Sequence, residues 1–170
     1  YTNAAGETVR VNPYFDFTLS GGNAVALTDT SKTRKVVDIT TCNECHSTLA
    51  LHGGGRVDTQ FCVLCHNAGT TDANSGNVLD LRIMAHKIHA GEPVKELFGQ
   101  DYAIWGYRDS MHDYAEVTYP QPLPNCVKCH DGSKTAQGDN WKNVPSRAAC
   151  GACHTGINFA TGGGATMENA

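Results

Sequence analysis

The sequence predicts a mostly irregular fold with some α-helix and little regular structure, entered through short N-terminal β-strands. Apolar residues make up 40% of the 170-residue chain, slightly below the roughly 45–50% of ordinary globular domains. Glycine is abundant, at 18 residues, and long amphipathic segments are few. A core built from side chains alone would be thin, so we expect another component to fill much of the interior.

Residues 1–40 form the predicted β-strand entry segment. The stretches 9–19 and 34–40 are rich in valine, tyrosine, phenylalanine, threonine and isoleucine, which is typical of strands. The segment contains no cysteine and no histidine. It is either a small hairpin leading into the next region or the end of a preceding β domain.

The cysteines repeat one motif. Cys-x-x-Cys-His occurs four times, starting at Cys42, Cys62, Cys126 and Cys150, and uses all eight cysteines. Eight cysteines could form four disulfides, and paired Cys-x-x-Cys sequences could bind zinc. Neither alternative needs a histidine after every second cysteine. The motif is the attachment signature of c-type haem, so we predict four covalently bound haem c groups.

The spacing suits this chemistry. Two thiols three positions apart reach the two vinyl groups on one porphyrin edge and form thioethers, and the following histidine becomes the proximal iron ligand. The predicted attachment residues are Cys42, Cys45, Cys62, Cys65, Cys126, Cys129, Cys150 and Cys153, and the proximal ligands are His46, His66, His130 and His154. Four haems in 170 residues leave about 42 residues each. The haems would therefore lie close together and form the core of a multihaem cytochrome c fold.

Four more histidines match the four sixth coordination positions. They are His52, His86, His89 and His112. Some of them could instead be surface histidines or hydrogen-bonded core histidines, but the equal count favours bis-histidine ligation at every haem. The three methionines are interpreted as packing or tail residues.

The strongest predicted helix covers 77–91 and carries two of these histidines. Asn77 could cap its start, and Gly91 suits its end. His86 and His89 lie three positions apart, on neighbouring parts of one helix face. They could therefore point at two different haems that lie close together.

His52 lies six residues beyond His46 and directly before three glycines. Six extended residues reach roughly 20 Å, which leaves little slack to return to the far side of the same haem. We therefore expect His52 to serve another haem, such as the one at Cys62 and Cys65. The glycines would permit a tight turn and a close approach to a flat ring, or they form a plain flexible turn. His112 has aromatic neighbours that could pack on porphyrins or in an ordinary core.

The haem domain is predicted to span 41–160, followed by a flexible tail at 161–170. The segment 119–126 holds three prolines and should be extended. The motifs start 20, 64 and 24 residues apart, which indicates two halves with two haems each. The start at Tyr1 rather than methionine indicates a mature form or an excised fragment.

The formal net charge of −4, with no basic cluster, argues against nucleic-acid binding. The chain has no hydrophobic run near 18 residues, so no membrane-spanning segment is expected. C-type haem is attached outside the cytoplasm, and the predicted location is therefore periplasmic or extracellular.

Several sequence blocks, in this order, resemble a known family: CNECHSTLALHGGGR, CVLCHNAGTTDANSGN, MAHKIHAGE, IWGYRDSMHDYAEVTYPQ and NCVKCHDG. Over roughly residues 9–160, the chain is similar to the multihaem domains of the OmcA/MtrC outer-membrane decahaem cytochromes. The resemblance implies bis-histidine haems in a staggered chain, with β domains beside them. It places His52, His86, His89 and His112 at histidines of these blocks. It also implies a cell-surface location and electron transfer from outer-membrane partners to metal oxides, soluble iron or flavins.

The number of motifs departs from the family pattern. Family haem domains commonly hold five haems, whereas this chain has four motifs. The chain would be a fragment, a tetrahaem relative or one subunit of an assembly. In an assembly, a neighbour could supply a sixth ligand.

An iron with two histidine ligands has no open coordination position. The predicted function is therefore electron transfer with other multihaem cytochromes at low potential, rather than enzyme catalysis, although non-specific reduction of metals or flavins is compatible with it. One alternative is a reductase of a small substrate, such as nitrite or hydroxylamine, at a five-coordinate haem. Another is a subunit of a polymeric haem filament.

Overall fold

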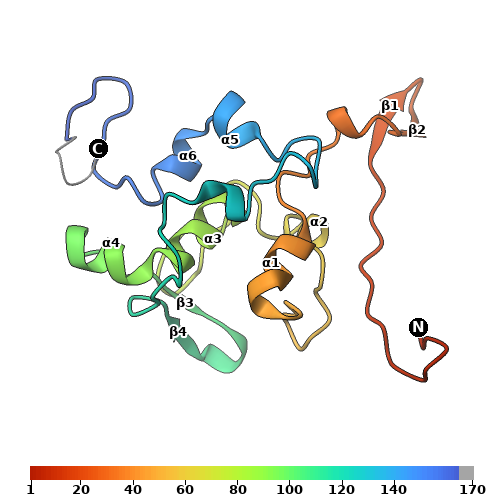
Figure 1. Ribbon diagram of the computed structural model, residues 1–170, viewed down its shortest axis with the longest axis horizontal. Coiled ribbons are helices and arrows are strands. Elements are labelled where there is room, and N and C mark those ends of the chain that lie inside the picture. The colour runs from red at the N-terminus through yellow and green to blue at the C-terminus, as the bar shows by residue number, and fades with distance from the viewer. Residues whose placement is uncertain (165–170) are drawn as a thin grey trace. The chain divides into compact units, whose positions relative to one another are not determined.

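The computed structural model describes residues 1–164 (Figure 1). The chain folds as two compact units. Of the described residues, the first unit comprises 1–65 and 126–143, and the second comprises 66–125 and 144–164. Most of the predicted tail at 161–170 lies outside the described residues. The units differ from the sequential halves that the motif spacing indicated, because the chain leaves the first unit after Cys65 and returns at Cys126. The first and third motifs therefore share a unit.

The first unit begins with a β-hairpin. Strand β1 (Phe17–Ser20) pairs antiparallel with β2 (Asn23–Ala26), with Phe17 opposite Ala26. Gly21 and Gly22 form the two-residue turn with φ of 57° and 81°, the left-handed conformation that tight hairpin turns require. Of the predicted strand at 9–19, only the last three residues lie in a strand.

The strand predicted at 34–40 was wrong. Ile39 begins helix α1 (Ile39–His46), and the Asp38 carboxylate caps it by accepting a hydrogen bond from the Thr40 backbone N–H at 2.9 Å. The local cap outweighs the strand preference of the valines and isoleucine. The rest of the first unit consists of short helical pieces: a 3₁₀ turn at Thr30–Lys32, α2 (Thr59–Cys62), a 3₁₀ turn at Cys126–Lys128, and α5 (Asn140–Asn143).

The Asp38 cap predicts a pH-dependent stability. Burial raises the pKa of Asp38, but hydrogen bonds from Lys35 and Thr40 outweigh it and hold the pKa at about 2. Because the folded pKa lies below the ordinary value of 3.8, this stabilisation is present above about pH 4 and is lost as the pH falls toward 2. We expect Asp38→Ala to cost about 1 kcal/mol at neutral pH, measured by chemical unfolding. Asp38→Asn keeps a capping oxygen and should lower the free energy of unfolding less. Its stability should also depend less on pH in the acid range. Equal losses of stability in the two variants would contradict this account.

The second unit contains the two longest apolar-faced helices. Helix α3 (Leu81–His89) is followed directly by α4 (Gly91–Phe98), and α3 also packs against α6 (Arg147–Cys150). A short antiparallel hairpin joins β3 (Ala103–Trp105) to β4 (Met111–Asp113) through a 3₁₀ turn at Tyr107–Asp109. The helix around His86 and His89 is confirmed, with a later start.

The predicted start of that helix was wrong, whereas its end lies where Gly91 indicated, since α3 ends at His89 with Ala90 as its C-terminal cap. Asp80 caps α3 by accepting from the Arg82 backbone N–H at 3.0 Å. Asn77 instead donates from Nδ2 to the Ala103 carbonyl at 2.7 Å, which ties its loop to β3. Gly91 follows this cap and also begins α4, and its missing side chain lets the chain pass close to the Tyr114 carbonyl.

Replacing Gly91 with alanine should lower stability, although alanine usually stabilises a helix. Alanine in place of helical glycine normally gains up to about 1 kcal/mol, but a Cβ at Gly91 would lie 1.8 Å from the Tyr114 carbonyl oxygen. We expect Gly91→Ala to destabilise the second unit by about 2 kcal/mol or more, measured by thermal unfolding. Gly55→Ala is the control, because its Cβ would meet its nearest atom at 3.9 Å. Similar stabilities for the two variants would refute the close approach.

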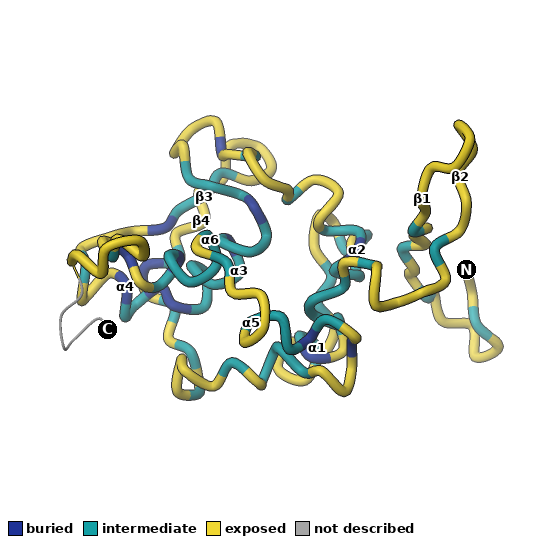
Figure 2. The backbone as a smooth tube through the Cα atoms, turned by 90° about the horizontal axis from the view of Figure 1, so that it is seen from above, coloured by how far each residue is buried: buried dark blue, intermediate teal, exposed yellow. Residues whose placement is uncertain are grey.

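The polypeptide buries few apolar side chains of its own (Figure 2). Among the described residues, the buried apolar side chains are Met84, Ala90, Val94, Tyr102, Ala115 and Ala152. The Tyr102 hydroxyl donates to the Val78 carbonyl at 2.7 Å, and burial raises its pKa to about 12. Exposed large apolar residues include Phe17 and Leu19 on the hairpin. Within residues 1–164, no helix has the length and apolar character needed to cross a membrane.

Candidate haem-binding site

The four motifs share a local backbone geometry. Helix α1 contains the whole first motif, α2 ends at Cys62, a 3₁₀ turn spans Cys126–Lys128, and α6 ends at Cys150. In the later three motifs, the N–H of the second cysteine donates to the carbonyl of the first at 3.2 Å. One helical turn places side chains three positions apart on the same side. Each motif therefore presents its two thiols together, as attachment to one porphyrin edge requires.

Cysteines of different motifs approach one another in the first unit. Burial, together with the nearby Cys129 and Cys62 thiols, raises the pKa of the Cys42 thiol to about 11. Cys42, Cys62 and Cys129 belong to the first, second and third motifs, and Cys42 and Cys129 are 87 positions apart in the sequence. Attachment positions of several motifs thus gather within one compact unit.

In the second unit, α3 lies beside the fourth motif. Its packing against α6 brings it to the helix that ends at Cys150. Burial lowers the pKa of Lys87 on α3, and the nearby Cys153 thiol partly opposes this shift. The helix that carries His86 and His89 is therefore adjacent to both cysteines of this motif.

Three histidines have their Nδ1 atoms directed at backbone carbonyls. His66 Nδ1 lies 3.0 Å from the Leu79 carbonyl, His86 Nδ1 lies 2.5 Å from that of Arg82, and His89 Nδ1 lies 2.7 Å from that of Ala85. A carbonyl oxygen only accepts, so each Nδ1 carries the proton and donates it. The lone pair of the neutral imidazole then belongs to Nε2, as in metal-binding histidines oriented by a backbone carbonyl.

These carbonyl acceptors were missed at the sequence level. For His86 and His89, each acceptor is four residues earlier on the same helix, so the helical period could have indicated them. The acceptor of His66, the Leu79 carbonyl, lies 13 positions later in the chain. The backbone carbonyl of His66 also accepts a hydrogen bond from the Leu81 N–H at 3.0 Å. His66 is therefore anchored to the start of α3.

His52 lies in the predicted tight turn. The backbone has φ of 50° at His52, 73° at Gly53 and 79° at Gly54, and Leu51 pairs with Arg56 across the turn. The glycine turn is thereby confirmed. A Cβ at Gly54 would lie 3.6 Å from the Arg10 guanidinium carbon, so the N-terminal segment closes over this turn.

His112 is exposed on β4, opposite Ile104. Its Nε2 lies 3.2 Å from the Ser110 hydroxyl oxygen and would lie 2.8 Å from a Cβ at Gly106. Ligation through Nε2 therefore requires a different side-chain orientation. The roles of His46, His130 and His154 as proximal ligands, and of His52 and His112 as distal ligands, stay predictions.

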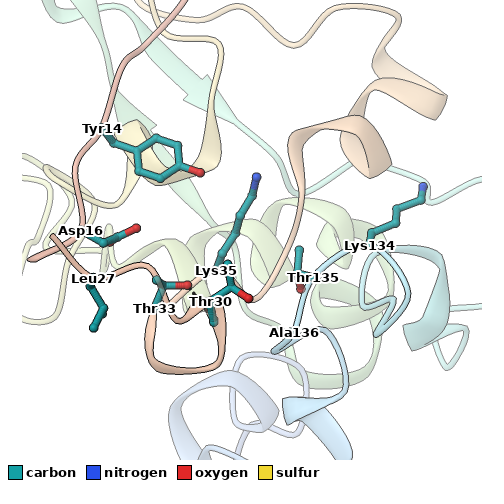
Figure 3. A pocket seen from close by; sticks show the side chains of 9 residues that line it. All are labelled: Tyr14, Asp16, Leu27, Thr30, Thr33, Lys35, Lys134, Thr135 and Ala136. Carbon is teal, nitrogen blue, oxygen red and sulfur yellow. Dashed lines mark hydrogen bonds between the residues drawn. The ribbon is translucent and has the colours of Figure 1, made fainter.

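Two hollows lie in the first unit. One, of about 330 Å³, lies between residues 14–35 and 134–136 and is lined by Tyr14, Lys35 and Thr135, among others (Figure 3). The other, of about 520 Å³, is lined by residues 7–10 and by Asn43, which stands between the cysteines of the first motif. Lys134, at the edge of the first hollow, also pairs with Glu44 of the first motif.

Comparison with known proteins identifies the family. The family model described as outer membrane cytochrome MtrC/MtrF-like, domains II/IV, matches residues 34–170. The chain belongs to this family. It is a domain of an outer-membrane multihaem c-type cytochrome, and the resemblance inferred from its sequence blocks is confirmed.

Individual relatives agree with this assignment of the MtrC/MtrF-like domain. Multihaem cytochrome MtrC of Shewanella baltica (strain OS185) is 28% identical over 160 residues, which cover 92% of this chain. The chain spans only 19% of that relative's length.

Two solved structures support the fold of the MtrC/MtrF-like domain. The outer membrane decahaem cytochrome OmcA matches with a TM-score of 0.67 and 34% identity, over 80% of this chain and 23% of its own. MtrC from S. baltica OS185 matches with a TM-score of 0.57 and 27% identity, over 99% of this chain and 23% of its own. The structure has few helices and small antiparallel sheets, which is consistent with the predicted irregular fold and with these similarities.

The residues of the MtrC/MtrF-like domain fit covalently bound haem. Each motif presents paired thiols from one turn of backbone, and His66, His86 and His89 are held in the tautomer that leaves Nε2 for a metal. Thiols that could form thioethers with the porphyrin vinyl groups, and imidazoles that could coordinate the iron, are the groups that c-type haem requires.

Proposed function

We propose that this MtrC/MtrF-like domain carries electrons through four covalently attached haems, each ligated by two histidines. The carbonyl-directed Nδ1 atoms carry this proposal, since they are found both at the proximal candidate His66 and at the distal candidates His86 and His89. When bound, haem supplies a reversible one-electron change at its iron. Two histidine ligands keep substrates away from that iron and favour outer-sphere transfer.

The chain's own residues hold and orient the cofactors in this proposal. The eight motif cysteines attach them, His46, His66, His130 and His154 are the proximal ligands, and His52, His86, His89 and His112 are the distal ligands. The carbonyls of Leu79, Arg82 and Ala85 fix the ring orientation of the histidines that donate to them. The small number of buried apolar side chains supports haem as the major core component.

We infer that the electrons pass between other multihaem cytochromes and external acceptors such as flavins, metal oxides or metal chelates. Family membership supports a location at the outer membrane, facing the cell exterior. The similarity to a protein described as an outer membrane decahaem cytochrome supports further haem-carrying partners or domains.

A reductase is the second candidate function. Its supporting observation is His112, whose Nε2 faces Ser110 in the present orientation. If His112 kept this position, one haem would be five-coordinate and open to a small substrate such as nitrite or hydroxylamine. The filament hypothesis has no comparable structural support.

Low-temperature EPR combined with a haem count per chain tests the proposal. Four haems with only low-spin, six-coordinate signals would support the electron-transfer role. A substantial high-spin signal at full haem loading would instead favour the reductase, and fewer than four haems would contradict the attachment scheme.

A further inference from the structure

A cluster of three charged residues joins two haem-attachment motifs in the first unit. Glu44 pairs with Lys128 at 2.5 Å and also with Lys134. Glu44 lies between Cys42 and Cys45, and Lys128 lies between Cys126 and Cys129. The pairs therefore connect segments 84 and 90 positions apart.

The positions of these charges within the motifs are equivalent. Glu44 and Lys128 each occupy the second position between the two cysteines, where the other two motifs have Leu64 and Ala152. They are the only charged residues at any intervening position of the four motifs. Opposite charges at matching positions allow two neighbouring motifs to pair with each other and with no other motif.

The cluster is partly shielded from solvent. The side chains of Lys128 and Lys134 are 23% and 30% exposed, and that of Glu44 is 41% exposed. A glutamate carboxylate is ionised at neutral pH, so Glu44 faces the two ammonium groups as an anion. Isolated exposed ion pairs contribute little to stability, so the expected effect of this cluster is on the position and electrostatics of the motifs.

We propose that Glu44, Lys128 and Lys134 form a charge clamp that positions the first and third attachment motifs against each other and sets the redox balance of their haems. The inference rests on the proposed haem attachment at both motifs. The cluster carries a net charge of about +1, since one carboxylate faces two ammonium groups. Ferric haem is more positive than ferrous haem, so extra positive charge nearby favours reduction.

The clamp predicts opposite shifts from two charge-neutralising variants. Glu44→Gln leaves two uncompensated lysines, so the reduced-to-oxidised ratio at a fixed applied potential should rise roughly threefold for the affected haems. Lys128→Gln removes one positive charge, and the ratio should fall by a similar factor. Spectroelectrochemical titration of the haem-loaded protein measures both.

Two further variants separate the clamp from general charge effects. Lys32→Gln also removes one positive charge from the first unit. Lys32 lies outside any motif, pairs with Asp29 at 3.4 Å and has a side chain that is 69% exposed, so this variant should shift the ratio much less. The exchanged pair Glu44→Lys with Lys128→Glu keeps the net charge and the pairing between positions 44 and 128, and it loses only the pair with Lys134, so it should return the ratio toward wild type.

Shifts in the same direction for Glu44→Gln and Lys128→Gln, or a Lys32→Gln shift as large as that of Lys128→Gln, would overturn the clamp. Haem content is measured first for each variant. Loss of loading in Glu44→Gln that the exchanged pair restores supports the clamp, whereas loss in both overturns it. If the wild type lacks haem at either motif, the proposed function itself fails; normal loading without opposite shifts removes only the clamp.

Discussion

Replacing His86 with alanine should leave one haem iron five-coordinate and high-spin, while the haem content per chain stays unchanged. The thioether bonds depend on the cysteines, so loss of a distal histidine removes a ligand and leaves the attachment intact. The substitution should preserve α3, because alanine is the best helix former. The change is visible as a high-spin EPR signal and as a shift in the absorption spectrum.

The helix offers internal comparisons for this prediction. Lys87→Gln, at a residue between the two histidines, should give no high-spin signal. His89→Ala should give a signal of the same size as His86→Ala, and the double variant should give twice that size if the two residues serve different haems. A double variant with the signal of a single one would mean that both histidines address the same iron. Absence of any high-spin signal in His86→Ala would remove His86 from the ligand set.

Replacing both Cys150 and Cys153 with alanine should lower the haem content by one per chain and destabilise the second unit. Helix α6 ends at Cys150 and packs against α3, so a haem attached there would fill space beside the main helix of this unit. We expect a loss of at least about 3 kcal/mol, the scale of removing a large core side chain. Haem absorbance per protein and thermal unfolding followed by circular dichroism measure the two effects.

The His112→Ala variant is the control for the cysteine pair, because it removes a proposed iron ligand and leaves every attachment residue in place. Its haem content should equal that of the wild type. An unchanged haem count in the Cys150/Cys153 variant would show that the fourth motif carries no haem. An unchanged unfolding temperature with one haem fewer would show that this haem is not part of the core.

The local chemistry could be read from the sequence because it depends on residues close together in the chain. A Cys-x-x-Cys-His motif needs one turn of backbone to present its thiols, so spacing alone indicates covalent haem. The sequence blocks likewise indicated the family, which the family comparison confirmed. The helix around His86 and His89 was predicted from its apolar residues for the same reason.

Element boundaries were less predictable, since several residues compete for each one. Asn77 and Asp80 are both good capping residues, and the choice depended on Asn77 having a distant partner in Ala103. At 34–40, strand-forming residues surround Asp38, whose side chain instead starts a helix. Such outcomes depend on which backbone groups remain available after the chain has packed.

The sequence by itself determined the number of attachment motifs, the residue types available as ligands and the family. The tertiary structure decided which motifs share a unit, that His66 Nδ1 donates to the Leu79 carbonyl 13 positions away, and that Glu44 meets Lys128 across 84 positions. The physical reason is the range of the interactions. Thioether attachment acts within five residues, whereas a carbonyl acceptor or an ion pair between distant segments exists only after the chain has folded back on itself.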